Sequence, residues 1–203
     1  MNHYVPMPQS FYEQPTLQLA QALLGCLLVK ETEEGVASGY IVETEAYMGP
    51  ADRAAHSFGN RRTKRTEIMF GKAGSVYTYT MHTHILVNVV SSDVGSPEAI
   101  LIRAVEPFEG TSLMENRRPG RSRKEWTNGP GKLTKALGIQ MNDYGHHFTA
   151  SPLTICEGWE QDSFHISSGP RIGIENTGEA RDYPWRYWVE GNSYLSKMRS
   201  PTT

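Results

Sequence analysis

The chain has 203 residues, of which 38% are hydrophobic and 21% charged, so it is long enough to bury the core of one compact domain spanning 1–203. A formal net charge of −2 argues against binding nucleic acid through overall charge, and no apolar run approaches the roughly 20 residues of a membrane-spanning helix. The N-terminus lacks a secretory pattern and a disulfide scaffold would use more than two cysteines, so we expect a reduced, cytoplasmic protein with no membrane partner.

Hydrophobic spacing and turn residues predict the elements in chain order. The predicted helices, with Thr16 capping the first and Gly138 ending the last, are 16–24, 111–117 and 132–138. The predicted strands are 26–30, 36–47, 75–80, 85–90, 99–105, 171–174 and 187–189. A long loop is expected over 48–63, and a hairpin tip over 81–84.

Strands outnumber helices, and their connections are too short for repeated helical crossovers. We therefore expect an α+β fold with a single compact domain. Its curved, largely antiparallel sheet is expected to be partly open and barrel-like, with short flanking helices and a protruding β-hairpin.

Two carboxylates on one predicted strand are the first chemical signal. Glu43, Glu45 and Tyr47 share a face because side chains alternate along a strand, and carboxylates are depleted from strands. Either both lie at a sheet edge and pair with arginines, or one acts as a general base or stabilises a sugar cation, as in glycoside hydrolysis.

Other polar and aromatic residues need partners too. Arg103 and Asn88 lie within apolar strands, where a cation or an amide must find a hydrogen-bonding partner. Tyr77 and Tyr79 share a face that either packs in the sheet or stacks on a base. His56, in the long loop, is either solvated or turned back toward the strand carboxylate.

Nine basic residues gather in two short runs without acidic residues: Arg61, Arg62, Lys64, Arg65, Arg117, Arg118, Arg121, Arg123 and Lys124. Either the fold brings them together as a positive surface for nucleic acid, or they are solvated loops. The 129–132 segment, which contains Lys132, is either an anion-binding helix start or a plain turn. His82, His84, His146 and His147 lack an acidic or thiolate partner at a familiar spacing, so no metal is expected.

Several motifs together resemble the alkyladenine (3-methyladenine) DNA glycosylase family, in a bacterial member. They are IVETEAYMGP at 41–50, AAHS at 54–57, VYTY at 76–79, LIRA at 101–104, EP at 106–107, GPGKL at 129–133, PRIGI at 170–174 and PWRYW at 184–188. The resemblance spans roughly residues 10 to 197. It implies a base-excision-repair enzyme that flips alkylated or deaminated purines out of duplex DNA and hydrolyses the N-glycosidic bond, leaving an abasic site.

The resemblance also implies residue roles. Glu45 matches the carboxylate that deprotonates the attacking water, and His56, Arg103 and the main-chain carbonyl of Ile172 match groups that hold this water. The side chains matching those that enclose the extruded base are Tyr47, His56, Tyr79 and Asn88, of which the last disfavours guanine. Glu43 is expected to be structural. The family implies a monofunctional, monomeric enzyme without metal, cofactor or lyase chemistry.

The hairpin tip departs from the family pattern. The family usually places a tyrosine there to fill the gap left by the flipped nucleotide, whereas this chain has His82, with His84 as the competing wedge. The residues expected to contact the DNA backbone are Arg61, Arg62, Lys64, Arg65, Arg121 and Lys132. Two rival functions are a carbohydrate-active hydrolase using Glu43 and Glu45, and a non-catalytic DNA-binding module. The preference among 3-methyladenine, 7-methylguanine, hypoxanthine and ethenoadenine is left open.

Overall fold

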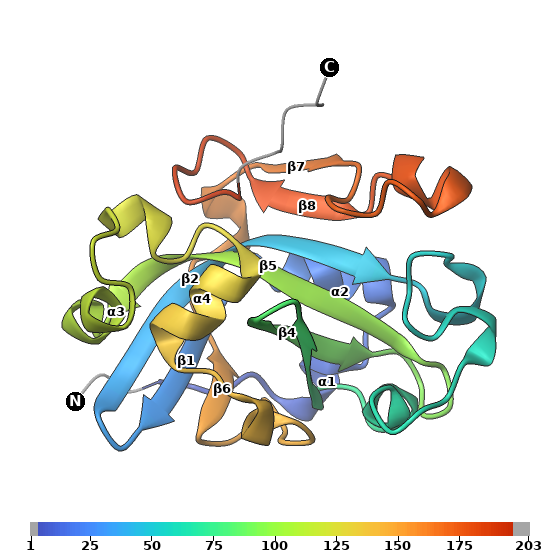
Figure 1. Ribbon diagram of the computed structural model, residues 1–203, viewed down its shortest axis with the longest axis horizontal. Coiled ribbons are helices and arrows are strands. Elements are labelled where there is room, and N and C mark those ends of the chain that lie inside the picture. Colours follow the sequence, from blue (N-terminus) through green and yellow to red (C-terminus); the bar gives the residue numbers. More distant parts are fainter. Residues whose placement is uncertain (1–3, 197–203) are drawn as a thin grey trace.

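Antiparallel strands form one curled, half-barrel sheet with short helices around it, in a computed structural model that describes residues 4–196 (Figure 1). The strands run in the order β3-β4-β5-β2-β1-β6, while β8 pairs with β2 and β7. Their bounds are β1 Leu27–Thr32, β2 Gly35–Tyr47, β3 Val76–Met81, β4 His84–Ser91, β5 Glu98–Glu109, β6 Leu153–Cys156, β7 Ile166–Gly169 and β8 Arg186–Val189. The helices are α1 Gln9–Tyr12, α2 Thr16–Ala22, α3 Thr111–Arg117 and α4 Pro130–Leu137. The predicted α+β single-domain fold is confirmed; residues 1–3 and 197–203 of the predicted domain lie outside the described residues.

Strand β2 occupies the middle of the sheet and carries the two carboxylates. The first half of one edge pairs with β1 and the second half with β8, while the other edge pairs with β5. Glu45 lies opposite Leu101 on β5 and opposite Arg186 on β8. Neighbours on both edges therefore hold this part of β2 inside the protein, with none of its backbone at a sheet edge.

Helices α2 and α4 cover the sheet because each presents an apolar stripe to it. Leu19 and Ala20 of α2 and Leu133 and Leu137 of α4 are buried in the main core. Helix α4 ends at Gly138, whose φ of 82° is the left-handed conformation that a helix-ending glycine adopts readily. The predicted end of this helix is confirmed, although it begins two residues earlier, with Pro130 in the first turn.

Two local predictions are wrong. Segment 171–174 is a loop, because the Ile172 amide donates to a side chain and Gly173 has a φ of 81°, which interrupts a strand. Thr16 does not cap α2; it is the first helical residue after Pro15, and its hydroxyl bonds the Ser91 hydroxyl over 2.9 Å. The predicted loop 48–63 also contains two short 3-10 turns, Gly49–Ala51 and Phe58–Asn60.

Candidate active site

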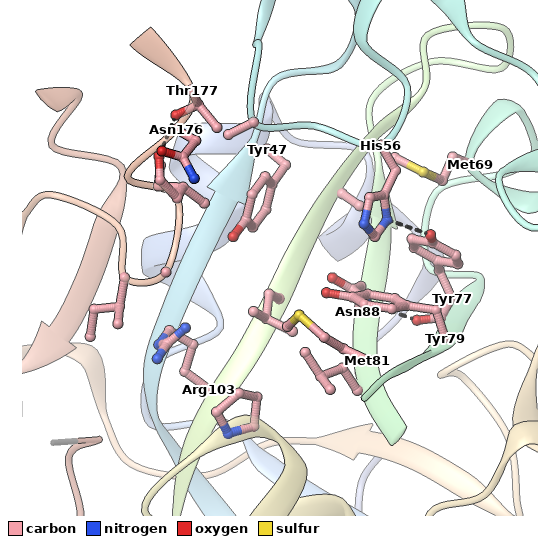
Figure 2. Close-up of a pocket in the computed structure, with 18 of the residues that line it drawn as sticks. Tyr47, His56, Met69, Tyr77, Tyr79, Met81, Asn88, Arg103, Asn176 and Thr177 are labelled. Carbon is pink, nitrogen blue, oxygen red and sulfur yellow. Dashed lines mark hydrogen bonds between the residues drawn. The ribbon is translucent and has the colours of Figure 1, made fainter. Parts of the chain in front are cut away.

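A cavity of about 310 Å³ opens beside the ends of β2 and β3 (Figure 2). Its lining combines aromatic, apolar and a few polar side chains, which is typical of sites that bind small rings. The lining residues are Tyr47, Ala54, His56, Met69, Tyr77, Tyr79, Met81, Leu86, Asn88, Ala99, Leu101, Arg103, Pro130 and Ile172 to Thr177.

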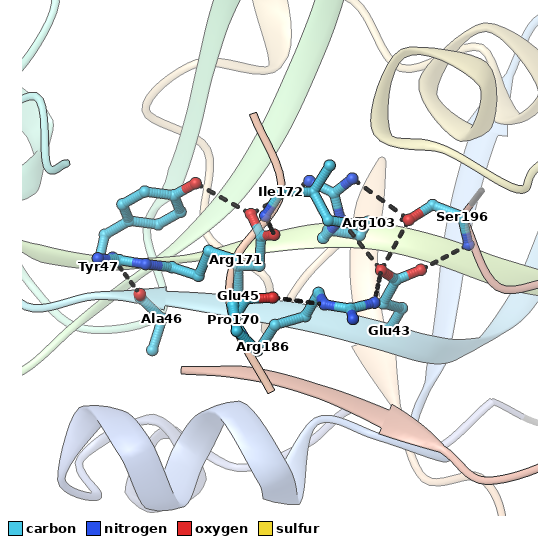
Figure 3. A network of polar contacts seen from close by, with 10 residues as sticks. All are labelled: Glu43, Glu45, Ala46, Tyr47, Arg103, Pro170, Arg171, Ile172, Arg186 and Ser196. Carbon is cyan, nitrogen blue, oxygen red and sulfur yellow. Dashed lines mark hydrogen bonds and ion pairs between the residues drawn. The ribbon is translucent and has the colours of Figure 1, made fainter. Parts of the chain in front are cut away.

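Glu45 lies behind this lining, fully buried and held by three donors (Figure 3). Its Oε1 accepts the backbone N–H of Ile172 over 2.7 Å. Its Oε2 accepts the hydroxyl of Tyr47 over 2.9 Å and Nη1 of Arg103 over 3.1 Å. All three donor residues line the cavity, so the carboxylate is held in one orientation next to the space that a ligand would occupy.

Glu43 holds Arg103 from the other side. Its Oε1 accepts hydrogen bonds from Nε of Arg103 and Nη1 of Arg186, each over 3.2 Å. Its Oε2 accepts a hydrogen bond from the backbone N–H of Ser196 over 2.7 Å. Arg103 thus bridges two buried carboxylates, as Figure 3 shows. Neither carboxylate is itself part of the cavity lining, but Arg186 and Ser196 also lie outside it, which supports the structural role expected for Glu43.

Aromatic rings face each other across the cavity, with Tyr47 on one side and His56 and Tyr79 on the other (Figure 2). The His56 ring meets Tyr79 edge-on at 4.6 Å, and its Nδ1 lies 2.7 Å from the Tyr77 hydroxyl. Burial, with smaller effects of Arg65 and Arg61, lowers the pKa of His56 to about 4. The imidazole is therefore neutral at neutral pH, and His56 itself adds no positive charge to this wall.

Asn88 lies on β4 opposite Tyr77 and is 3% exposed. Its Nδ2 donates to the Tyr77 main-chain carbonyl over 3.0 Å, which fixes the orientation of the amide. Because Asn88 lines the cavity, a bound ring would meet a rigid polar group on this wall.

The structure thus brings the residues predicted for the site together, on two walls. Glu45, Tyr47, Arg103 and Ile172 form one cluster, while the second wall holds His56, Tyr79 and Asn88. For Tyr77 the sequence left sheet packing and base stacking open, and the structure places this residue in the cavity lining. Sequence reasoning missed residues 175–177 of the lining, which follow the motif at 170–174.

The hairpin tip borders the cavity. Met81 lines it and is 46% exposed, whereas His82 occupies the turn with a φ of 54° and an exposed side chain. His84 packs on the start of α4, where a Cβ added to Gly131 would lie 2.6 Å from the Cβ of His84. The tip therefore offers an apolar side chain directly beside the two predicted wedge histidines.

The two basic runs lie at opposite ends of the molecule's long axis, on either side of β3 and β4 (Figure 1). Arg61, Lys64, Arg65 and Arg121 are exposed, and the Arg65 guanidinium lies 6.0 Å from the Tyr79 ring. Two other members of the runs pair with carboxylates, Arg62 with Glu67 and Arg117 with Glu34. Lys132, which lies outside both runs, donates to Asn128 over 2.7 Å.

Within residues 4–196, no group of three His, Cys, Asp or Glu side chains is arranged to hold a metal ion. In the same part of the chain, no helix is long and apolar enough to cross a membrane. That the enzyme needs no metal or cofactor stays a prediction.

Comparison with known proteins shows the family of this chain. The family model of methylpurine-DNA glycosylase (MPG) matches residues 10–193. Proteins named "Putative 3-methyladenine DNA glycosylase" from Bacillus velezensis and Bacillus subtilis are 70% and 68% identical over 192 residues, which cover 95% of this chain and 97% of each relative. The protein of that name from Listeria monocytogenes serotype 4a (strain HCC23) is 48% identical over 190 residues, 93% of this chain and 91% of the relative.

Proposed function

Because the chain belongs to the methylpurine-DNA glycosylase family and is a DNA-3-methyladenine glycosylase of base excision repair, we propose that Glu45 is its catalytic base and that the cavity binds the flipped purine. The observation that carries this assignment is the position of Glu45, a fully buried carboxylate whose three donors all line the cavity.

The proposed chemistry breaks the bond between the damaged purine and C1′ of the deoxyribose. The purine leaves with the bonding electron pair, and the oxygen of a water forms the new bond to C1′. Glu45 stabilises the positive charge that develops on the sugar and accepts a proton from the water. An abasic site and a free base result, and no covalent enzyme intermediate is needed. Arg103 and Ile172 hold Glu45, and we propose that they also help to hold the water.

The aromatic walls suit an alkylated purine. Alkylation at N3 or N7 makes the purine cationic, and the ring faces of Tyr47 and Tyr79 attract a cation. His56, which is neutral at neutral pH, lies on the same wall as Tyr79 and does not repel that charge. Asn88 is proposed to crowd the exocyclic amino group of guanine.

Duplex DNA must present the base from outside the stack, since the reacting bond is unreachable inside it. We propose that the hairpin tip fills the resulting gap, with His82 as the wedge and His84 as the alternative. Phosphate contacts are proposed for Arg61, Lys64, Arg65 and Arg121, and also for Arg62 and Lys132 once DNA competes with their present partners. Deaminated purines as additional substrates, action as a monomer and a cytoplasmic location belong to the same proposal.

Release of free base from alkylated duplex DNA tests the assignment of Glu45. The Glu45→Gln variant retains the size and a hydrogen-bonding oxygen of the side chain but cannot take the proton of water. We expect it to bind lesion-bearing DNA with near wild-type affinity and to release no measurable base. Near-normal turnover of a folded Glu45→Gln variant would refute the mechanism.

A further inference from the structure

A second buried ion pair lies next to the site and takes no part in the chemistry proposed above. Arg171 donates to both carboxylate oxygens of Asp52, with Nη2 to Oδ1 over 2.8 Å, and both side chains are fully buried. Charged groups are almost never buried unless they are paired, and a buried pair is weak evidence for stability. The contacts of the pair therefore say more about its role than its contribution to stability does.

The pair ties together three of the segments that line the cavity: the end of β2, the loop that leads to His56 and the loop that begins at Arg171. Nη1 of Arg171 donates to the carbonyl of Ala46 on β2 over 2.9 Å, and the next residue, Ile172, donates its amide to Glu45. Asp52 accepts the backbone amides of Met48 over 3.1 Å and Ala54 over 3.0 Å, which fixes the loop that leads to His56.

Arg171 also backs an aromatic wall. Its guanidinium carbon lies 4.7 Å from the centroid of the Tyr47 ring and 5.0 Å from that of Trp185. Arg171 is fully buried and does not line the cavity, whereas Tyr47 does, so the cation contacts the ring from the protein interior (Figure 3). A base stacked on Tyr47 would thus have a guanidinium behind the ring.

We propose that the Asp52–Arg171 pair is a positioning element that sets Tyr47, Glu45 and the His56 loop relative to one another, and that Asp52 makes the wall acceptable to a cationic purine. A bare guanidinium behind Tyr47 would repel a positively charged base and would compete with it for the π electrons of the ring. The carboxylate of Asp52 compensates this charge. The inference rests on the proposed stacking of the base against Tyr47.

The test compares single-turnover release of cationic 7-methylguanine with that of a neutral base, hypoxanthine or ethenoadenine, from duplex DNA at saturating enzyme. In Asp52→Asn the guanidinium loses its counter-charge, so we expect release of 7-methylguanine to fall about tenfold more than release of the neutral base. A loss of structural support alone would slow both bases by the same factor.

A second variant does not depend on any neutral substrate. Arg171→Lys keeps the charge and can still reach Asp52, but it loses the planar stack and the two-pronged hydrogen bonding. We expect release of 7-methylguanine to fall at least about tenfold with DNA affinity near that of the wild type, because small displacements of reacting groups are costly.

Lys30→Gln is the matched control. It breaks another buried pair, Lys30–Asp143, neither member of which lines the cavity. It should lower the melting temperature yet leave the release rate of the folded enzyme unchanged. If Asp52→Asn and Arg171→Lys behave like Lys30→Gln, with normal rates and an unchanged ratio between the two bases, the pair is only structural. That result would leave the assignment of Glu45 intact, since Glu45→Gln tests it separately.

Discussion

Arg103 lies between Glu43 and Glu45 and donates to both, so the two carboxylates differ in what surrounds them more than in their distance from the arginine. Glu45 has donors that line the cavity, while Glu43 is tied to Arg186 and Ser196. The donors that distinguish Glu45 from Glu43, Tyr47 and Ile172, border the cavity, whereas Arg186 and Ser196 lie outside its lining. The proposed function therefore assigns the chemistry to Glu45 and a supporting role to Glu43, on the same strand face.

Glu43→Gln should therefore affect stability more than base release. Removing the charge leaves two buried arginines with one carboxylate fewer, a kind of change that typically costs roughly 3 to 5 kcal/mol. Urea unfolding should show a loss of that order, whereas the folded variant should still release base. A variant as stable as the wild type but without activity would instead place Glu43 in the chemistry.

A second prediction concerns the pH dependence of stability. The pKa of His56 is about 4 in the folded protein and near 6.5 in an unfolded chain. Between these values the unfolded chain takes up a proton that the folded protein does not. Stability from this source is complete above pH 6.5 and is lost as the pH falls toward 4. In urea titrations at pH 7 and pH 5, His56→Gln should lose less stability than the wild type on acidification. An equal loss in both proteins would contradict a buried, neutral His56.

The β3–β4 hairpin is the element whose role depends most on single side chains. Met81, His82 and His84 all lie at its tip, but only Met81 both lines the cavity and exposes a large apolar surface. Apolar side chains, methionine among them, are common wedges between base steps. The His82 imidazole, smaller and more polar than a tyrosine ring, would then share this role with the neighbouring thioether.

Base extrusion measured with a fluorescent base analogue should distinguish the contributions of Met81, His82 and His84. We expect His82→Ala to reduce extrusion and base release from duplex DNA, His82→Tyr to preserve or raise them, and Met81→Ala to reduce them further than His82→Ala. His84→Ala is the comparison variant, since this side chain packs against α4. A loss confined to His84→Ala would assign the wedge to His84.

Across the whole molecule, a net charge of −2 coexists with two basic runs at opposite ends of the long axis. The β3–β4 hairpin lies between them (Figure 1), so we expect a duplex running along this axis to meet positive charge on both sides of the hairpin. Such contacts release counterions, and affinity then depends on salt through the number of phosphates neutralised.

Replacing Arg61, Lys64 and Arg65 with alanine should flatten the slope of log affinity against log salt by about 0.9 for each phosphate contact removed. Alanine at Arg121, Arg123 and Lys124, which are also exposed, should act in the same way. Arg181→Ala is the matched comparison, because this exposed arginine lies outside both basic runs and pairs with Asp182. Unchanged slopes for both triple variants would mean that the runs are solvated loops.

Regular alternation made β2 and the contacts of its polar side chains predictable. The shared face of Glu43, Glu45 and Tyr47 follows from strand geometry, and the structure places the first two on Arg103 and joins Tyr47 to Glu45. The buried polar groups Arg103 and Asn88 were predicted to need partners, and each has one. Such inferences succeed because they depend only on local geometry and on the cost of an unpaired polar group.

Contacts between distant segments could not be predicted from the sequence. The pattern at 171–174 reads as a strand, yet Arg171 bonds Asp52, 119 residues away, and the backbone follows the side chain. The loop over 173–177 lines the cavity without any periodic pattern. No local rule could have paired these segments, since their positions depend on the folded, curled sheet.

The bond between Ser196 and Glu43 has a consequence for synthesis of the protein. Arg103 is oriented by a carboxylate whose own position depends on the backbone of residue 196, far along the chain from β2. In a nascent polypeptide that still lacks this residue, the arginine beside Glu45 has an incomplete anchor even when all the strands are present. We expect ribosome-bound chains that expose only the first 190 residues to be inactive on alkylated DNA. Base release would then begin only after residue 196 has left the ribosome and its backbone amide and hydroxyl have reached Glu43.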